Sequence, residues 1–216
     1  MNVLVTAFEP FGGQKVNASR LAVSALPDIV AGASVTRLCL PCVFGAAGDV
    51  ATAAVDELAP DIVIACGEHR GAAGLALERV ALNVASTDES APDEAGRAPV
   101  EEILATDAPG ALLAALPLEE CVRAAQAAGV PAFLSCSAGL YVCNSVMFAL
   151  LDQRRSHLAA GLAAPAMAGF VHVPGTPAQA CRGTLTEPLP SMETDRAAAG
   201  LAAVIEACAA RLKAES

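Results

Sequence analysis

The segment from Ala132 to Arg155, AFLSCSAGLYVCNSVMFALLDQRR, contains the pattern that decides the fold. A short apolar run at Ala132–Cys136 predicts a buried strand, and the residues after it, which include Gly139, favour a turn. A longer run with helical spacing begins at Val142. We therefore expect a strand over Ala132–Cys136, then a turn, and then a helix over Val142–Arg155.

The same alternation of short apolar runs and longer Ala-rich segments extends in both directions along the chain. The predicted strands are Val3–Ala7, Val35–Pro41, Ile62–Cys66, Arg79–Val84, Ala132–Cys136 and Gly169–Val173, and each apolar run suits burial on both faces. The predicted helices are Ala18–Ala25, Ala47–Leu58, Leu118–Ala128, Val142–Arg155 and Asp195–Lys213. This order predicts an α/β fold, a three-layer α/β/α sandwich with a twisted, mostly parallel central sheet.

The chain of 216 residues reads as one domain, because no linker, repeat or shift in composition divides residues 1–216. The last helix is expected to be amphipathic and to cover one face of the sheet through Leu201, Val204 and Cys208. The segment Ala85–Gly110 is rich in Asp, Glu, Pro, Gly and Ser, which predicts a long surface loop or hairpin.

Composition limits the partners and the compartment. A formal net charge of −10 with no run of Lys or Arg argues against nucleic acid, and Pro131 and Asn144 interrupt the one long uncharged stretch, so we expect no membrane span. The N-terminus has no basic region of a signal peptide. Eight cysteines without a secretory signal predict free thiols in the cytoplasm.

Cys143 has the most suggestive context of the cysteines, because it lies just inside the helix that follows the turn. A helix N-terminus lowers the pKa of a thiol there and supplies a backbone N–H for an oxyanion. A buried helical cysteine that packs like Ala is the alternative. The pair Cys39 and Cys42 lies inside a predicted strand, so a redox or zinc role is disfavoured, and no metal or cofactor is expected.

Three histidines could serve as the base for a cysteine nucleophile. His157 lies at a polar helix end, where a solvated cation is favoured. His69 and His172 both lie at the carboxyl ends of predicted strands, where α/β sheets place ligands. Glu78, beside an apolar strand, is either a solvated strand end or the acceptor that orients an imidazole.

Four motifs occur in order along the chain: TAFEPFGG at Thr6–Gly13 followed by Asn17, ERVALN at Glu78–Asn83, SAGLYVCN at Ser137–Asn144, and GFVHVP at Gly169–Pro174 followed by Pro177 and Gln179. Together they resemble the motifs of the pyrrolidone-carboxylate peptidases, also called type I pyroglutamyl peptidases. The resemblance covers essentially the whole chain.

The resemblance implies a cysteine peptidase that removes pyroglutamate from peptide N-termini through a thioester acyl-enzyme. Cys143, His172 and Glu78 map onto the family's catalytic triad. Phe8 and Phe11 map onto the rings that hold the lactam and Asn17 onto the substrate loop; Val142 and Glu68 complete the expected substrate-binding set. The family uses no cofactor and commonly forms homotetramers.

The chain departs from the family pattern at several positions. Glu68 stands where the family usually has Gln; as a carboxylate it could accept the lactam N–H and would repel acidic peptides. The loop after Asn83 is about two residues longer than the pattern, and the Arg expected before Pro92 is missing. Because that Arg is associated with the oxyanion site, Arg97, Arg70 or backbone donors would replace it, or the rate would be lower. Ser145 replaces a family His beside Cys143.

Two other hypotheses remain at this stage. One is a different Cys-dependent α/β amidase, resembling amidotransferases or deglycases. The other is a weakly active or non-catalytic homologue that binds pyroglutamyl peptides without turnover because the Arg is missing.

Overall fold

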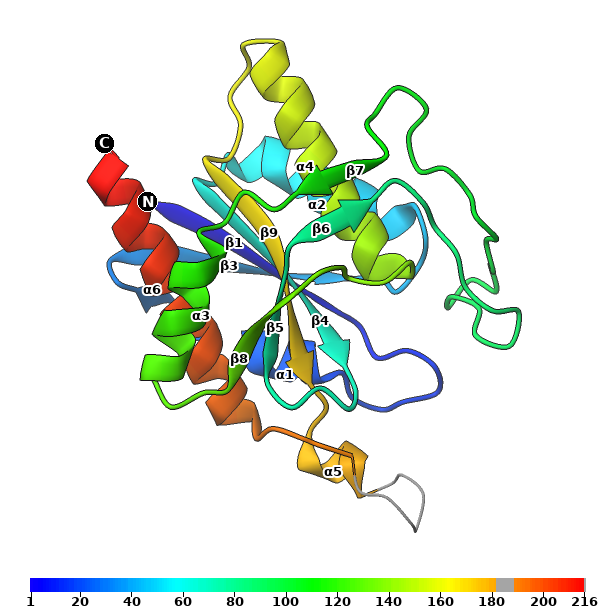
Figure 1. Ribbon diagram of the computed structural model, residues 1–216, viewed down its shortest axis with the longest axis horizontal. Helices are drawn as coiled ribbons and strands as arrows, with labels where there is room; N and C mark the ends of the chain where they lie inside the picture. Colours follow the sequence, from blue (N-terminus) through cyan, green and yellow to red (C-terminus); the bar gives the residue numbers. More distant parts are fainter. Residues whose placement is uncertain (182–188, 216) are drawn as a thin grey trace.

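The computed structural model describes residues 1–181 and 189–215, and Figure 1 labels its elements. The strands are β1 (Asn2–Phe8), β2 (Ile29–Val30), β3 (Ala33–Leu40), β4 (Ile62–His69), β5 (Leu75–Glu78), β6 (Val80–Leu82), β7 (Ala111–Leu113), β8 (Ala132–Ser135) and β9 (Met167–Pro174). The helices are α1 (Ala18–Ser24), α2 (Ala46–Leu58), α3 (Leu118–Ala127), α4 (Val142–Ala159), α5 (Pro177–Ala180) and α6 (Thr194–Glu215).

The main sheet has the strand order β2-β3-β1-β4-β9-β5-β8 in the described residues. Strands β3, β1, β4 and β9 run parallel to one another. Strand β5 is antiparallel to β9 but parallel to β8, and the short β2 is antiparallel to β3. The prediction of a mostly parallel sheet is confirmed.

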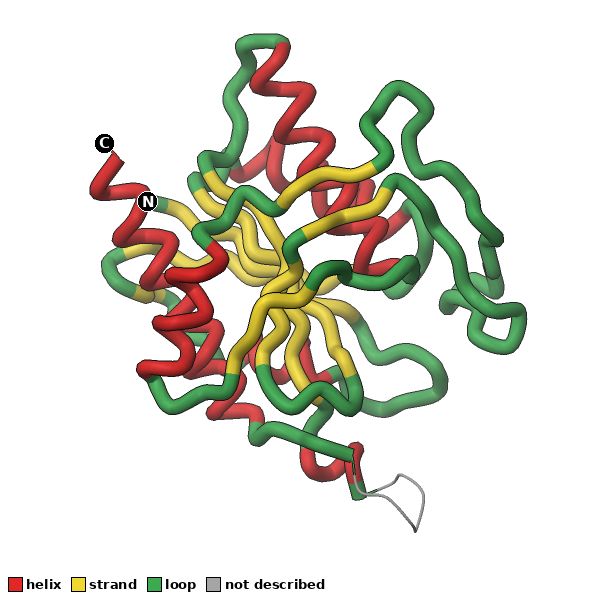
Figure 2. Tube along the Cα trace, in the orientation of Figure 1, coloured by secondary structure: helices red, strands yellow, loops and turns green. Residues whose placement is uncertain are grey.

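Helices cover both faces of this sheet (Figure 2). Buried residues of α1, α3 and α6 belong to one core cluster, and those of α2 and α4 belong to a second. Helix α6 buries Leu201, Val204 and Cys208 against its face, so the predicted amphipathic pattern and the three layers are confirmed. Within the described ranges, no helix has both the length and the apolar character needed to cross a bilayer.

Of the strand predicted over Arg79–Val84, only Val80–Leu82 (β6) is a strand, and the expectation that it is buried on both faces of the main sheet is wrong. The chain leaves the main sheet at the exposed Arg79: Leu75–Glu78 (β5) pairs in that sheet, whereas Val80–Leu82 (β6) pairs with β7 in a separate two-stranded sheet. Burial alternates along β6, with Ala81 buried and its neighbours partly exposed. A strand with this pattern packs through one face only, here against α4, and is not buried on both faces.

Strand β8 also departs from the expected burial on both faces, because it is the edge strand and Phe133 is 41% exposed. The elements β2, β5, β7 and α5 were not predicted; each is two to four residues long, too short for a periodic pattern to identify.

The segment Ala85–Gly110 is the long surface loop that its composition predicts, and it projects beyond the sheet in Figure 1. A single bridge joins Ala85 to Glu102 within it. Asn83 holds the last part of this loop: its side-chain amide donates to the carbonyl oxygens of Ala105 and Ala108, and its Oδ1 accepts from the Ala105 N–H. The loop is therefore tied to the edge of β6.

Candidate active site

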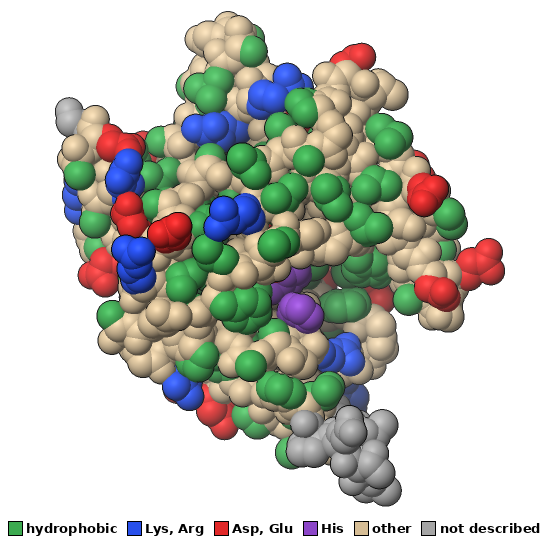
Figure 3. Space-filling view, in the orientation of Figure 1, with side chains coloured by type: hydrophobic (Ala, Val, Ile, Leu, Met, Phe, Trp, Pro, Cys, Tyr) green, Lys and Arg blue, Asp and Glu red, His purple; other side chains and the backbone are tan. Residues whose placement is uncertain are grey.

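A cleft of about 280 Å³ lies where the ends of β4 and β9 meet the start of α4. It is lined by Phe11, Glu68, His69, Glu78, Ser137, Ala138, Gly139, Tyr141, Cys143 and His172. In Figure 3 histidine side chains are visible in this hollow, surrounded mostly by hydrophobic groups. A larger hollow of about 360 Å³ between α2 and α4 has no cysteine or histidine among its described lining residues.

Cys143 is the second residue of α4, as the sequence predicts. Gly139, with φ of 80°, makes the turn that brings the chain from β8 to the helix. In the described structure the N-cap residue, Tyr141, makes no side-chain capping bond. The first N–H groups of a helix have no acceptor within the helix, so the amides around Cys143 are available at the cleft.

The pKa of the Cys143 thiol is raised, contrary to the prediction that the helix start lowers it. Burial is the largest cause, and Cys42, Glu78 and Glu68 add to it. The backbone N–H of Cys143 itself acts in the opposite direction but does not compensate. At neutral pH the free thiol is therefore protonated, and a thiolate requires a nearby base.

His172 and Glu78 form a buried pair beside Cys143. The His172 Nδ1 lies 2.8 Å from the Glu78 Oε1, and the two side chains are only 8% and 1% exposed. The pair results from the antiparallel pairing of β5 with β9, in which Ala76 opposes His172 and Glu78 opposes Phe170. The prediction of a solvated strand end at Glu78 is wrong, and the prediction of an acceptor that orients an imidazole fits this geometry.

Gly67 lies where the Cys143 thiol and the His172 imidazole come together, and sequence reasoning missed it. A Cβ atom at this position would lie 2.9 Å from the Cys143 Sγ, 3.0 Å from the His172 Cδ2 and 2.8 Å from the Phe170 Cζ. The thiol and the imidazole thus occupy the space next to a residue with no side chain. The available signal was a glycine at the end of an apolar strand, which often marks a close approach of other groups.

The other two histidines have different positions. His69 lies at the rim of the cleft, with its ring centroid 5.5 Å from that of His172 in an edge-to-face arrangement. His157 lies near the end of α4, where its Nδ1 is 3.0 Å from the carbonyl oxygen of Ala163. Only His69 and His172 belong to the cleft.

The predicted aromatic residues separate into wall and floor. Phe11 lines the cleft, with its ring centroid 6.2 Å from that of Tyr141, a cleft residue that the site prediction did not include. Phe8 is buried below, where its ring centroid lies 6.4 Å from that of Phe170. Val142 is fully buried in the same core. Among the predicted apolar residues, Phe11 is the one at the cleft surface.

Asn17 does not line the cleft. Its side chain caps α1, because Oδ1 accepts from the Ser19 N–H at 2.9 Å, while Nδ2 donates to the Glu9 carbonyl oxygen at 3.1 Å. The Glu68 carboxylate, although Glu68 belongs to the cleft, also bonds within the protein: it accepts from the Ala18 N–H at 2.6 Å.

Neither arginine considered as a replacement for the missing one reaches the cleft. Arg97 pairs with Glu102 and lies over the Phe44 ring, and Arg70 pairs with Glu68 at 2.9 Å. The cleft lining contains no Arg or Lys among the described residues. Of the replacements expected for the missing Arg, only the backbone N–H groups at the start of α4 lie at the cleft. Among all the residues that the structure describes, no group of three or more His, Cys, Asp or Glu side chains is arranged to hold a metal ion.

Comparison with known proteins identifies similar sequences and structures. The sequence model of the family described as pyroglutamyl peptidase matches residues 1–211. The pyrrolidone-carboxylate peptidase of Erwinia tasmaniensis is 42% identical over 82% of this chain and 80% of its own length. That of Streptomyces coelicolor is 41% identical over 99% and 94%. The crystal structure of pyroglutamyl peptidase I from Bacillus amyloliquefaciens superposes with a TM-score of 0.87 at 32% identity, covering 97% of each chain.

Proposed function

Because this chain belongs to the pyroglutamyl peptidase family, we propose that it hydrolyses the bond after an N-terminal pyroglutamyl residue, with Cys143 as nucleophile. The enzyme is a hydrolase of the pyroglutamyl peptidase I type. One observation carries the mechanism: the bonded Glu78–His172 pair and Cys143 at the start of α4 line a single cleft.

His172 acts as the base in the first step. An ionised Glu78 can only accept hydrogen bonds, so Nδ1 of His172 carries a proton and Nε2 is free to take one. Because burial keeps the Cys143 thiol protonated, proton transfer to Nε2 accompanies attack of the sulfur on the pyroglutamyl carbonyl. Glu78 stabilises the imidazolium that results.

The negative charge of the tetrahedral intermediate develops at the start of α4. The Cys143 N–H and the partial positive charge of the helix N-terminus stabilise the oxyanion there. The imidazolium of His172 then gives its proton to the departing amine, and the C–N bond breaks to leave a thioester on Cys143. Water, deprotonated by His172, attacks the thioester and releases pyroglutamate and the free thiol.

The composition of the cleft supports selection of a neutral ring. Phe11 and Tyr141 present aromatic surface to a flat, uncharged lactam. A glutamyl residue with a free ammonium and a carboxylate would lose its hydration there without a matching partner for each charge, which costs several kcal/mol. Discrimination would therefore come from excluding charge rather than from many polar contacts.

The cytoplasm and a homotetramer are the further expectations from the family. All eight cysteines lie in the described part of the chain and are free thiols, which fits a reducing compartment. Val100, Ile103 and Leu113 are each more than half exposed and offer apolar surface to a partner subunit. Light scattering of the purified protein tests the tetramer.

The proposal is tested by hydrolysis of a fluorogenic pyroglutamyl amide in reducing buffer. We expect turnover by the wild type, none by Cys143→Ser, and none of a matched glutamyl amide by either. A folded, reduced wild type that binds pyroglutamyl peptides without releasing product would contradict the proposal. That result would favour the binding homologue, which is the main alternative because the described lining of the cleft includes no Arg or Lys.

A further inference from the structure

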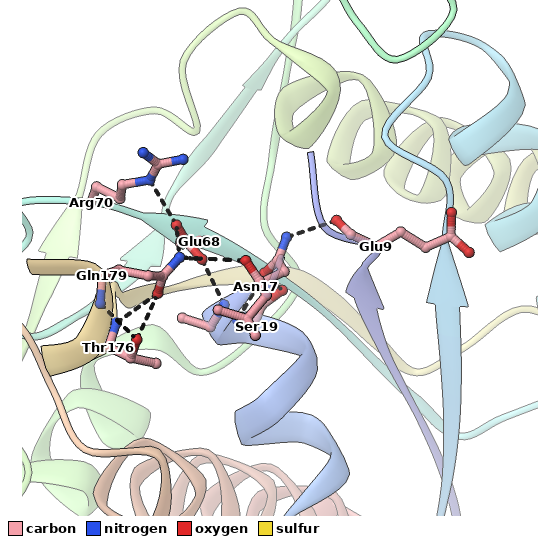
Figure 4. Close-up of polar contacts among 9 residues, drawn as sticks. Glu9, Asn17, Ser19, Glu68, Arg70, Thr176 and Gln179 are labelled. Carbon is pink, nitrogen blue, oxygen red and sulfur yellow. Dashed lines mark hydrogen bonds and ion pairs between the residues drawn. The ribbon is translucent and has the colours of Figure 1, made fainter. Parts of the chain in front are cut away.

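The carboxylate of Glu68 is enclosed by hydrogen bonds from three parts of the chain. The Nε of Arg70 donates to Oε1 at 2.9 Å, and the Ala18 N–H donates to Oε2 at 2.6 Å. The Nε2 of Gln179 lies 2.9 Å from each oxygen. Only 2% of the Glu68 side chain is exposed. Figure 4 shows Arg70, Gln179 and the start of α1 converging on this carboxylate.

These donors leave the carboxylate no capacity to bind a ligand. A carboxylate has about four acceptor sites, and four contacts from Arg70, Ala18 and Gln179 occupy them. The lactam N–H would have to displace one of these bonds. Glu68 is thus better suited to hold the protein together at the cleft than to bind the lactam.

What Glu68 holds is the segment that carries an aromatic wall of the cleft. Residues 9–17 connect β1 to α1 and include Phe11. Ala18 is the first residue of α1, and the N-cap Asn17 donates to the Glu9 carbonyl oxygen, which closes the segment at its base. The bond from the Ala18 N–H therefore fixes the base of this segment to β4.

The second anchor lies in α5. The side-chain oxygen of Gln179 accepts from the backbone N–H and the hydroxyl of Thr176, and this capping box fixes the direction of its amide nitrogen. That nitrogen also lies 3.5 Å from the Val16 carbonyl oxygen. Glu68 and Gln179 together connect β4, α5 and the segment 9–17.

We propose that Glu68 is a positioning residue that fixes residues 9–17 against β4 and α5, so that Phe11 is in place before the pyroglutamyl ring binds. The inference rests on the proposed function only for the identity of the ring. A neutral Gln at this position would turn its NH₂ group toward another donor, Arg70 or Gln179, and would lose at least one bond. The negative charge is thus needed for this arrangement of donors.

Glu68→Gln tests the proposal, and Glu119→Gln is the matched control. Glu119 is an exposed carboxylate on α3 that also pairs with an arginine, Arg123. We expect Glu68→Gln to raise KM for the pyroglutamyl amide about tenfold and to keep kcat within about threefold, because a charge-assisted bond is lost away from the reacting atoms. Glu119→Gln should match the wild type in both constants.

Limited trypsin digestion gives a readout that does not require turnover. Lys15 is exposed within the segment 9–17, and Arg123 is an exposed reference site on α3. We expect cleavage after Lys15 to accelerate at least about fivefold in Glu68→Gln, with cleavage after Arg123 unchanged. Arg70→Gln, which removes only the exposed donor, should give a smaller change in the same direction.

The proposal is overturned if Glu68→Gln keeps the wild-type KM and the wild-type cleavage rate at Lys15. A fall in kcat with KM unchanged also overturns it, because the substitution would then act on the chemical step. Equal acceleration of cleavage at Lys15 and Arg123 overturns it as well, because the effect would then be a general loss of stability. Failure of the proposed function itself would appear differently, as a wild type without hydrolysis, and the digestion would still test the anchoring.

Discussion

Replacement of Gly67 by Ala tests the geometry of the site most severely. The added methyl would lie 2.8 Å from the Phe170 Cζ, 2.9 Å from the Cys143 Sγ and 3.0 Å from the His172 Cδ2, all shorter than a normal carbon contact. Phe170 is fully buried and His172 nearly so. The methyl can therefore be accommodated only if the thiol, the imidazole or the ring beneath them moves.

The expected cost is both chemical and structural. Overpacking of a buried site costs about 1–3 kcal/mol, of which the reduced freedom of the unfolded chain returns about 0.4–1 kcal/mol. The chemical cost is larger, because a misplacement of about 1 Å between reacting groups can cost about 10²-fold in rate. We expect kcat for a pyroglutamyl amide to fall about 100-fold while the protein remains folded.

The assay compares steady-state hydrolysis and thermal unfolding of Gly67→Ala with those of Gly110→Ala. A Cβ at Gly110 would have no heavy atom within 4 Å, so this control carries the same chemical change without the crowding. Gly110→Ala should retain wild-type kcat. If Gly67→Ala kept more than half of the wild-type kcat, the thiol and the imidazole would not meet at Gly67, and the reasoning would be refuted.

Four further outcomes are expected. Glu78→Gln should lower kcat at least about 100-fold with little change in KM, because an amide can hold His172 in the wrong tautomer; equal kcat values would contradict this. Asn144→Ala should destabilise the protein by about 3 kcal/mol in urea unfolding, since it removes the side-chain partner of three partly buried backbone groups, the N–H and C=O of Leu82 and the C=O of Val84. Alkylation of Cys143 by iodoacetamide should reach half of its maximal rate at a higher pH than that of N-acetylcysteine, because burial raises the thiol's pKa and so lowers the thiolate fraction at any given pH. Tyr141→Leu should raise KM severalfold in steady-state assays, because the ring facing Phe11 is lost.

The parts of the fold that the sequence predicts are those encoded by local periodicity. Helix α4 and the amphipathic α6 follow from apolar spacing within single segments, and the position of Cys143 follows from the turn before α4. The pairing of His172 with Glu78 was expected from motifs, although its structural origin, an antiparallel β5, was not. The break at Arg79 between β5 and β6 depends on which strands each of them pairs with, and local spacing does not carry that information.

The roles of the smaller site residues depend on contacts between distant parts of the chain. Glu68 and Gln179 are 111 residues apart, and no local pattern links them. Gly67 matters because of what lies beside it rather than because of its own conformation. Asn17 belongs to a recognisable motif, yet its side chain caps α1. Burial raises the pKa of the Cys143 thiol, and this effect outweighs the lowering expected from the helix start, which is the only one of the two that the sequence shows.

The central claim, covalent catalysis by Cys143, is tested most directly by trapping the acyl-enzyme. A pyroglutamyl ester is mixed with the wild type, the reaction is quenched with acid within its first turnovers, and the digested protein is analysed by mass spectrometry. We predict one added pyroglutamyl group on the peptide that contains Cys143, and none after the same treatment of Cys143→Ala. An enzyme that turns over the ester without this adduct, or that carries it on another cysteine, would contradict the mechanism.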